Sequence, residues 1–243
     1  MTQQTWLWLG CLSMAAGAIF FGFGAERAKN DRWQVVYVLN FFICAIASVL
    51  YLAMTQRQGF NVIFDRPTFW VRYITWMFST PLTIVLLSYL GRTKPIILAS
   101  MIGADVLMIA TGFVAAISPK PITNLWYIVS CGFYLGLAYL LLKHYRDRAI
   151  DSYPRSKSVF NRLLTVHLVI WSLYPVVWIL AGTGINVINS TVETASYTIL
   201  DVAAKVGFGF LALSSLQKLE KSELNQPEFD ESLSRDNYTA RNR

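Results

Sequence analysis

Long stretches of apolar residues, separated by short polar segments, follow one another along most of this chain. A helix needs roughly 20 apolar residues to cross the hydrocarbon core of a bilayer, and each stretch is about that long. We therefore predict an all-α membrane protein, a seven-transmembrane-helix bundle that forms one domain of residues 1–217. The predicted spans are Trp6–Gly24, Val35–Met54, Phe69–Leu90, Pro95–Ile117, Leu125–Leu142, Phe160–Ala181 and Val192–Leu216.

The composition agrees with this pattern and changes near the carboxyl end. Of the 243 residues, 55% are hydrophobic and only 14% are charged, which excludes an ordinary soluble domain. Beyond Leu216 the chain turns to Glu, Asp, Asn, Ser and Arg, with few apolar residues. Such a segment buries too little apolar surface to fold, so residues 218–243 are predicted to form a disordered cytoplasmic tail.

Basic residues gather in alternate loops. Lys and Arg close to a span favour the cytoplasmic side, so the amino terminus is predicted to be extracellular and the carboxyl terminus cytoplasmic. The net charge of +7 is then mainly a signal of topology, and no nucleic-acid partner is expected. The basic residues that follow the first and third spans, or surround the loop after the fifth, are Arg27, Lys29, Arg32, Arg92, Lys94, Lys143, Arg146, Arg148, Arg155, Lys157 and Arg162.

The cysteines indicate neither a disulfide framework nor a metal site. Cys11, Cys44 and Cys131 all fall inside predicted spans, and their spacing matches no metal-binding motif. We interpret all three as small packing residues, and we expect no metal.

A charged pair lies in the middle of the seventh span. Lys205 sits in the apolar stretch from Tyr197 to Leu213, where Asp201, one helical turn earlier, is the other charge. Burying such charges in hydrocarbon costs several kcal/mol, so they normally face a protein interior and mark a functional site. Residues four apart share a helix face, which points both side chains into one cavity. A lysine in such surroundings is suited to form a Schiff base with an aldehyde.

The third span carries polar residues at helical spacing. Arg72, Thr75 and Ser79 recur on one face with Trp76 beside them, which predicts that these residues line one cavity. From its position alone, Arg72 is equally consistent with a side chain that extends to the membrane interface.

The fourth and sixth spans add weaker signals. Trp171, Tyr174 and Trp178 form an aromatic stripe around Pro175, although such stripes more often serve packing, and prolines in spans commonly only kink the helix. We interpret Asp105 as a hydrogen-bond partner between helices rather than as a proton carrier.

Three segments, in order, resemble the microbial rhodopsins. They read RYITW at 72–76 with TP at 80–81, WSLYPVVW at 171–178, and LDVAAKVGFG at 200–209. The resemblance covers all seven spans and implies all-trans retinal, bound to Lys205 as a protonated Schiff base. It also implies that Tyr51 and Tyr174 are hydrogen-bond partners of the counterion Asp201. The retinal pocket that it implies consists of Trp76, Thr80, Met108, Gly112, Ser130, Trp171, Tyr174, Pro175 and Trp178.

Residues of the third span also indicate which ion the protein transports. Proton-pumping members carry an aspartate where this chain has Thr75, which cannot accept the Schiff-base proton. Lys205 and Arg72 then face the single carboxylate of Asp201, which leaves one positive charge in excess and favours an anion. Thr75 and Ser79 resemble the halorhodopsins at these positions, so we expect chloride or another halide there, beside Arg72.

The second proton-relay position, an aspartate in many proton pumps, is Leu86 here. The anion pumps of cyanobacteria carry an aspartate at this position, whereas Leu86 is closer in character to the archaeal pumps, so the subgroup stays open.

Two further residues have alternative interpretations. His167, in the cytoplasmic half of the sixth span, could assist anion release or proton exchange, or it could be a packing residue. Glu193, near the outer end of the seventh span, could form a gate with Arg72, or it could be a solvated residue favoured at a helix start.

The sequence therefore predicts a light-driven inward anion pump in the plasma membrane rather than an enzyme. The alternatives are a sensory photoreceptor that signals to a partner, a light-gated anion channel, and a residual proton pump with another acceptor in place of Thr75. By analogy with the family, we expect a homotrimer in the lipid bilayer.

Overall fold

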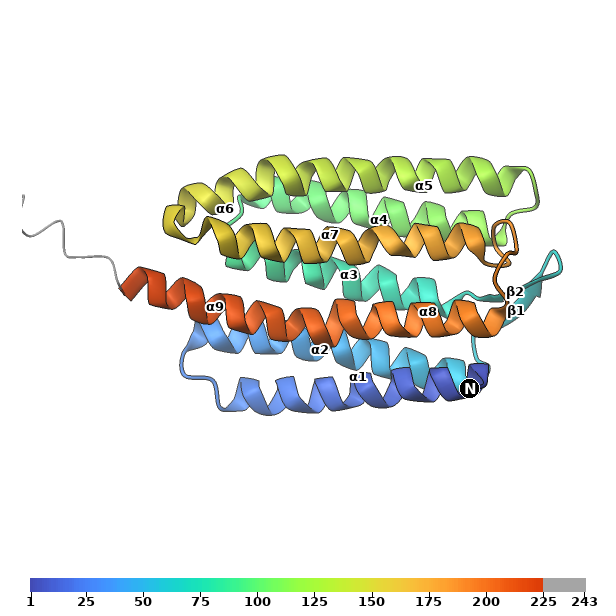
Figure 1. Cartoon of the computed structure of the whole chain (residues 1–243), viewed down its shortest axis with the longest axis horizontal. Helices are drawn as coiled ribbons and strands as arrows, with labels where there is room; N and C mark the ends of the chain where they lie inside the picture. Colours follow the sequence, from blue (N-terminus) through green and yellow to red (C-terminus); the bar gives the residue numbers. More distant parts are fainter. Residues whose placement is uncertain (225–243) are drawn as a thin grey trace, which may run out of the picture.

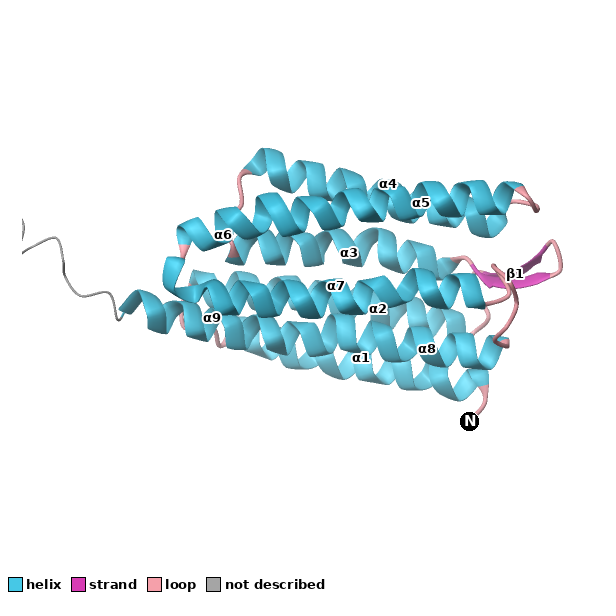
Figure 2. Ribbon diagram, turned by 45° about the horizontal axis from the view of Figure 1, so that its top comes forward, coloured by secondary structure: helices cyan, strands magenta, loops and turns pink. Residues whose placement is uncertain are grey.

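Seven helical columns lie side by side in the computed structural model, which describes residues 1–224 (Figures 1 and 2). Each column is long and apolar enough to cross a membrane, as the sequence predicted. The helices are α1 (Gln3–Glu26), α2 (Asp31–Thr55), α3 (Val71–Leu90), α4 (Pro95–Ile117), α5 (Ile122–Tyr139), α6 (Arg146–Ser152), α7 (Lys157–Leu180), α8 (Ser190–Val202) and α9 (Phe208–Leu224).

Two columns are continuous helices that contain a π-helical turn. The π turn η1 (Leu140–Tyr145) joins α5 to α6, and the π turn η3 (Ala203–Gly207) joins α8 to α9. A short 3-10 turn, η2 (Pro154–Ser156), precedes α7. A π turn inside a helix is uncommon and frequently marks a functional site.

Local sequence signals set several helix starts. The side chains of Thr2, Asn30 and Asn189 accept hydrogen bonds from backbone N–H groups in the first turns of α1, α2 and α8. These contacts satisfy donors that have no partner inside the helix. Pro95 begins α4, at the position where a proline fits a helix best.

The columns form a closed ring. Neighbours in sequence pack against each other from α1 to α5, α6 packs against α7, α7 packs against α8 and α9, and α8 returns to α1. Contacts between α5 and α7 are sparser than those between the other neighbouring columns. The ring leaves an interior that side chains from α3, α4, α5, α7 and α8 surround.

A small antiparallel hairpin, β1 (Phe60–Ile63) and β2 (Arg66–Phe69), connects α2 to α3 and covers the end of the bundle near the amino terminus (Figure 1). We call this the hairpin end. Arg66 is buried, and its guanidinium donates hydrogen bonds to the carbonyl oxygens of Ser118 and Thr183 and to the hydroxyl of Thr123. This one side chain therefore ties the hairpin to the loops before α5 and after α7.

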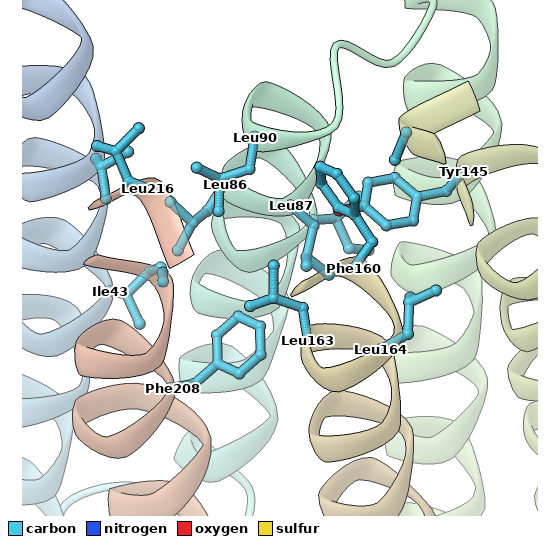
Figure 3. Close-up of a cluster of buried hydrophobic side chains, with 14 of the residues drawn as sticks. Ile43, Leu86, Leu87, Leu90, Tyr145, Phe160, Leu163, Leu164, Phe208 and Leu216 are labelled. Atoms are coloured by element: carbon cyan, nitrogen blue, oxygen red, sulfur yellow. The ribbon is translucent and has the colours of Figure 1, made fainter. Parts of the chain in front are cut away.

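The opposite end, which we call the basic end, carries the loops after α1 and α3 and the segment between α6 and α7. A buried apolar cluster fills the bundle interior toward this end. Figure 3 shows side chains from α3, α7 and α9 gathered in it, including Leu86, Leu163, Phe208 and Leu216. The interior is thus tightly packed on this side.

Several boundaries differ from those predicted. Phe69 belongs to β2, because the hairpin uses residues that the hydropathy pattern assigned to the third span. The fifth column continues to Ser152, past the predicted end at Leu142. The last helix continues to Leu224, past the predicted domain end at residue 217, since Trp33 donates to Glu220 and Arg32 pairs with Glu223 there. The remainder of the predicted tail lies outside the described residues.

Candidate functional site

A buried ion pair lies at the centre of the bundle. The Lys205 ammonium nitrogen is 2.5 Å from Oδ1 of Asp201, and the exposed fractions of the two side chains are 4% and 0%. Asp201 is the penultimate residue of α8, and Lys205 is in the π turn η3. The prediction that Asp201 and Lys205 lie on the same face of their helix is therefore confirmed. The pairing offsets part of the free-energy cost of burying each charge at this depth.

Three neutral donors from three other helices hold the carboxylate of Asp201. Tyr51 on α2 donates to Oδ2 over 2.8 Å, and Tyr174 on α7 donates to Oδ1 over 2.9 Å. The indole Nε1 of Trp76 on α3 is 3.3 Å from Oδ1. Hydrogen bonds to an ionised acceptor are stronger than neutral ones, so this set fixes Asp201 as a carboxylate in one position.

A large cavity adjoins Lys205. It is bounded mostly by aromatic, hydroxyl-bearing and small side chains. Its lining includes every residue that the sequence placed in the pocket: Trp76, Thr80, Met108, Gly112, Ser130, Trp171, Tyr174, Pro175, Trp178 and Lys205. Sequence reasoning missed eight further lining residues: Tyr73, Thr83, Ile109, Tyr127, Cys131, Tyr134, Tyr197 and Ala204.

The missed residues on α5 do carry a sequence signal. Tyr127, Ser130 and Tyr134 recur at helical spacing, in the same pattern that singled out the sixth span. Tyr127 stacks on Trp178 with 4.7 Å between ring centroids and donates a hydrogen bond of 3.0 Å to the carbonyl of Pro175. Cys131, which the sequence suggested was only a packing residue, also lines the cavity.

The aromatic walls are held in place by hydrogen bonds. Trp178 donates from Nε1 to the hydroxyl of Tyr73 over 2.7 Å. The hydroxyl of Ser130 donates to the carbonyl of Met108 over 2.8 Å. These bonds fix the shape of the cavity before any ligand enters it.

Ser79 reaches the cavity with a hydroxyl that has no hydrogen-bond partner within residues 1–224. The side chain is almost fully buried, at 1% exposed. A buried hydroxyl without a partner costs free energy, so such a group in a native protein calls for a ligand or a water.

Thr75 and Arg72 do not lie where the sequence predicted. Thr75 is fully buried but absent from the cavity lining, and its hydroxyl donates to the carbonyl of Val71 over 3.3 Å. Arg72 lines a second, smaller cavity toward the hairpin end. The prediction that one cavity holds all these side chains is therefore wrong. Trp76, which lines both cavities, is part of the wall that separates them.

Glu193 pairs with Arg72 in the smaller cavity. Its Oε1 is 3.1 Å from the Nη1 of Arg72, and both side chains are largely buried. The guanidinium also lies over the ring of Tyr197, 4.4 Å from its centroid. The predicted contact between Glu193 and Arg72 is present. It also corrects the predicted excess of one positive charge, because Glu193 neutralises Arg72.

Asp105 and His167 lie away from this charged centre. Asp105 accepts a hydrogen bond of 2.8 Å from Thr80, which links α4 to α3 as we expected. His167 is buried toward the basic end and does not line the cavity. Its ring packs on Trp171 with 4.2 Å between centroids, and its Nε2 lacks a partner among the described residues. Leu86, at the predicted relay position, is fully buried in the apolar cluster.

The described part of the chain holds no group of three His, Cys, Asp or Glu side chains that could bind a metal. The cavity suits covalent attachment of an aldehyde to the amine of Lys205. Lys205 contributes the one amine to the lining, and a lysine in low-dielectric surroundings reacts readily with an aldehyde. The rings of Trp76, Trp171 and Trp178 in the lining are flat apolar surfaces of the kind against which a polyene packs. These residues therefore fit the retinal that the sequence resemblance implied.

Comparison with known proteins gives consistent matches over nearly the whole chain. A family model described as "Bacteriorhodopsin-like protein" matches residues 1–219. The bacteriorhodopsin of Haloterrigena sp. (strain arg-4) is 36% identical over 225 residues, which cover 90% of this chain and 90% of the relative. Cruxrhodopsin-1 of Haloarcula argentinensis is 34% identical over 225 residues, which cover 88% of this chain and 90% of the relative.

Solved structures agree with these matches. The crystal structure of cyanorhodopsin N2098R from the cyanobacterium Calothrix sp. NIES-2098 superposes with a TM-score of 0.85 and 36% identity, covering 90% of this chain and 97% of that chain. The thermophilic rhodopsin from Rubrobacter xylanophilus superposes with a TM-score of 0.84 and 32% identity, covering 90% of this chain and 98% of that chain.

Proposed function

The chain belongs to the bacteriorhodopsin-like family of microbial rhodopsins, and from that premise we propose that it is a light-driven inward anion pump. Members of this family bind retinal covalently through a lysine Schiff base and are multi-pass proteins of the plasma membrane. These two properties hold for this chain as a member. The transported ion, its direction and the residues that carry it are our proposal.

We assign the attachment of retinal to Lys205, because it is the lysine in the lining of the large cavity. Bound there, retinal supplies one thing, a light-driven change of shape at the nitrogen of Lys205. The protein supplies the rest. Trp76, Trp171 and Trp178 hold the chromophore, and Asp201 compensates the positive charge on the Lys205 nitrogen.

The observation that carries the proposal is the unpaired hydroxyl of Ser79 in a cavity whose lining, within residues 1–224, includes no carboxylate. Asp201 is the carboxylate next to Lys205, and three donors besides the ammonium stabilise its charged form. Thr75 and Ser79 offer hydroxyl groups, which can donate to an anion but cannot store a proton. This environment suits chloride or another halide better than proton transfer.

The ion pair of Glu193 and Arg72 affects which interactions can hold the anion. Because the charges of these two ion pairs balance, the four side chains leave no net positive charge to drive anion binding. We infer that the anion depends on hydrogen bonds from Ser79, and from Thr75 once its bond to Val71 opens, together with the nearby positive charge at Lys205. Arg72 and Glu193 then act as the gate on the hairpin side.

We place the hairpin end outside and the basic end in the cytoplasm, following the distribution of Lys and Arg. An anion that enters past Arg72 and Glu193 then leaves toward the basic end, which requires that the apolar cluster around Leu86 open after light absorption. His167 lies at the start of that route, where its unpaired Nε2 could donate to or accept from the moving ion. The homotrimer stays a prediction, which analytical ultracentrifugation in detergent would test.

The proposed function is tested by light-induced pH changes in retinal-fed cells that express the protein. The cells are measured in sodium chloride and in sodium sulfate, each with and without a protonophore. Inward anion pumping makes the medium alkaline in chloride, and the protonophore increases the signal because protons follow passively. Acidification that the protonophore abolishes would instead show outward proton pumping. The absence of any signal would support a sensor, and currents that reverse with the anion gradient would support a channel.

A further inference from the structure

The wall of the large cavity between α5 and α7 is one side chain thick at Tyr134. This side chain lines the cavity, and its hydroxyl is 2.7 Å from Oγ of Ser172 on α7. Ser172 is exposed, as are its helix neighbours Val169, Leu173 and Val176, so this face of α7 meets lipid. Tyr134 therefore has the cavity on one side and the bilayer on the other.

Two bridges cross from α5 to α7. Tyr127 reaches the carbonyl of Pro175, and Tyr134 reaches Ser172 and, at 3.2 Å, the carbonyl of Leu168. The two tyrosines are separated by about 10 Å along the helix, given a rise of about 1.5 Å per residue. We call this strip the α5–α7 seam.

Little closes the seam between its two bridges. Ser130 and Cys131 line the cavity there and are only half-buried. The hydroxyl of Ser130 turns away to the carbonyl of Met108 on α4. The sparse packing of α5 against α7 therefore coincides with a stretch of cavity wall made of small side chains.

Packing closes both ends of the bundle to a ligand of this size. Toward the basic end the interior is filled by the apolar cluster that includes Leu86, Phe208 and Leu216 (Figure 3). Toward the hairpin end Arg66 ties the hairpin to two loops, and the pair of Arg72 and Glu193 lies beneath it. Retinal is apolar and dissolves in the bilayer, so the side of the bundle is the direction from which it arrives.

We propose that the α5–α7 seam is the entrance through which retinal passes from the bilayer into the cavity, and that the hydrogen bond between Tyr134 and Ser172 is its latch. Opening requires that the Tyr134 ring swing away from Ser172. Ser172 then keeps its bond of 2.7 Å to the carbonyl of Leu168, so α7 itself stays intact. This inference rests on retinal binding and is independent of which ion is transported.

The test is the rate at which pigment forms when all-trans retinal is added to membranes from cells grown without it. Tyr134→Phe keeps the ring and removes the latch, so pigment should form about fivefold faster, as loss of a hydrogen bond of about 1 kcal/mol gives. Ser172→Ala removes the bond between Tyr134 and Ser172 but leaves the bond of 3.2 Å from Tyr134 to the carbonyl of Leu168, so it should give a smaller increase. Ser172→Phe places a ring over the seam and should slow pigment formation severalfold.

Ser100→Ala and Ser100→Phe are matched controls. Ser100 is an exposed serine on α4 whose hydroxyl donates to the carbonyl of Ile96 over 2.8 Å, as Ser172 donates to Leu168. Both controls should form pigment at the wild-type rate, and the final absorbance per protein should be equal in all variants. Wild-type rates in Tyr134→Phe, Ser172→Ala and Ser172→Phe would overturn the proposal, as would equal effects at Ser100.

Discussion

Glu193 on α8 holds Arg72 on α3 in an ion pair, with 3.1 Å between Oε1 and Nη1, although 121 residues separate them in sequence. A charge count limited to Arg72, Asp201 and Lys205 leaves one positive charge in excess. The ion pair removes this excess. An anion in the large cavity must therefore be held by local hydrogen bonds and by proximity to Lys205, which makes the energetic role of each group separable by mutation.

Neutralising Glu193 should restore the missing positive charge. In Glu193→Gln the guanidinium of Arg72 loses its charged partner, so chloride should bind more tightly, by several-fold. Titration of the pigment absorption with chloride measures this affinity. Glu223→Gln is the control, because Glu223 pairs with Arg32 and Arg92 at the basic end and should leave the affinity unchanged. Weaker chloride binding in Glu193→Gln would contradict the charge account.

Removing the unpaired hydroxyl of Ser79 should weaken chloride binding. A hydrogen bond to a charged group contributes about 1.5–3 kcal/mol, so Ser79→Ala should raise the dissociation constant by at least about tenfold. The same absorption titration measures it. Ser100→Ala, on the lipid-facing side of α4, should change nothing. An unchanged dissociation constant in Ser79→Ala would show that the anion does not contact this hydroxyl.

Placing a carboxylate at residue 75 should convert the anion site into a site for proton transfer. In Thr75→Asp the new negative charge repels an anion and offers a proton acceptor at the position that proton-pumping members use. The chloride-dependent shift in absorption should disappear, and light should acidify the medium of expressing cells in a protonophore-sensitive way. A chloride-dependent shift that survives the substitution would refute the electrostatic reasoning at this position.

Lys205→Ala should abolish pigment formation, because no other lysine lines the large cavity within residues 1–224. The purified protein should show no visible absorption after incubation with all-trans retinal. Lys120→Ala is the matched control. Lys120 donates to the carbonyl of Gly184 at the hairpin end, outside the cavity, and its replacement should leave the pigment intact. A coloured Lys205→Ala product would rule out the assigned attachment.

A methyl group at residue 10 should disturb the counterion from a distance. An added Cβ at Gly10 would overlap the ring of Tyr51, which donates to Asp201. Overpacking of this kind costs about 1–3 kcal/mol, so Gly10→Ala should lower the temperature of thermal bleaching and shift the absorption maximum. Gly132→Ala on α5 meets open space and should do neither. Equal behaviour of the two variants would argue against a tight fit at Tyr51.

Much of this arrangement follows from local sequence. Hydropathy alone gives the seven columns, because a membrane span must be apolar over a fixed length. The pairing of Asp201 with Lys205 follows from their spacing on one helix, and the predicted pocket residues all line one cavity.

What the sequence does not reveal depends on contacts between distant segments. Three such contacts are the ion pair of Arg72 and Glu193, the hairpin anchored by Arg66, and the seam at Tyr134. The periodicity of apolar residues within one helix does not determine how that helix is rotated against its neighbours, so it cannot predict these contacts. The separation of Arg72 from Ser79 is a further example. Both lie on one face of α3, but the bulky side chain of Trp76 lies between them and lines both cavities.

The π turn from Ala203 to Gly207 has a mechanical consequence for Lys205, which it contains. A π turn pairs residues five apart instead of four, so the backbone hydrogen-bond register of the helix changes at Lys205. A movement that begins at Lys205 can be taken up by a local change of this register. Asp201, on the regular helix just before it and fixed by donors on three other helices, stays as a stationary reference. A deformable turn that carries the chromophore lysine thus lies directly after a counterion that hydrogen bonds hold in place.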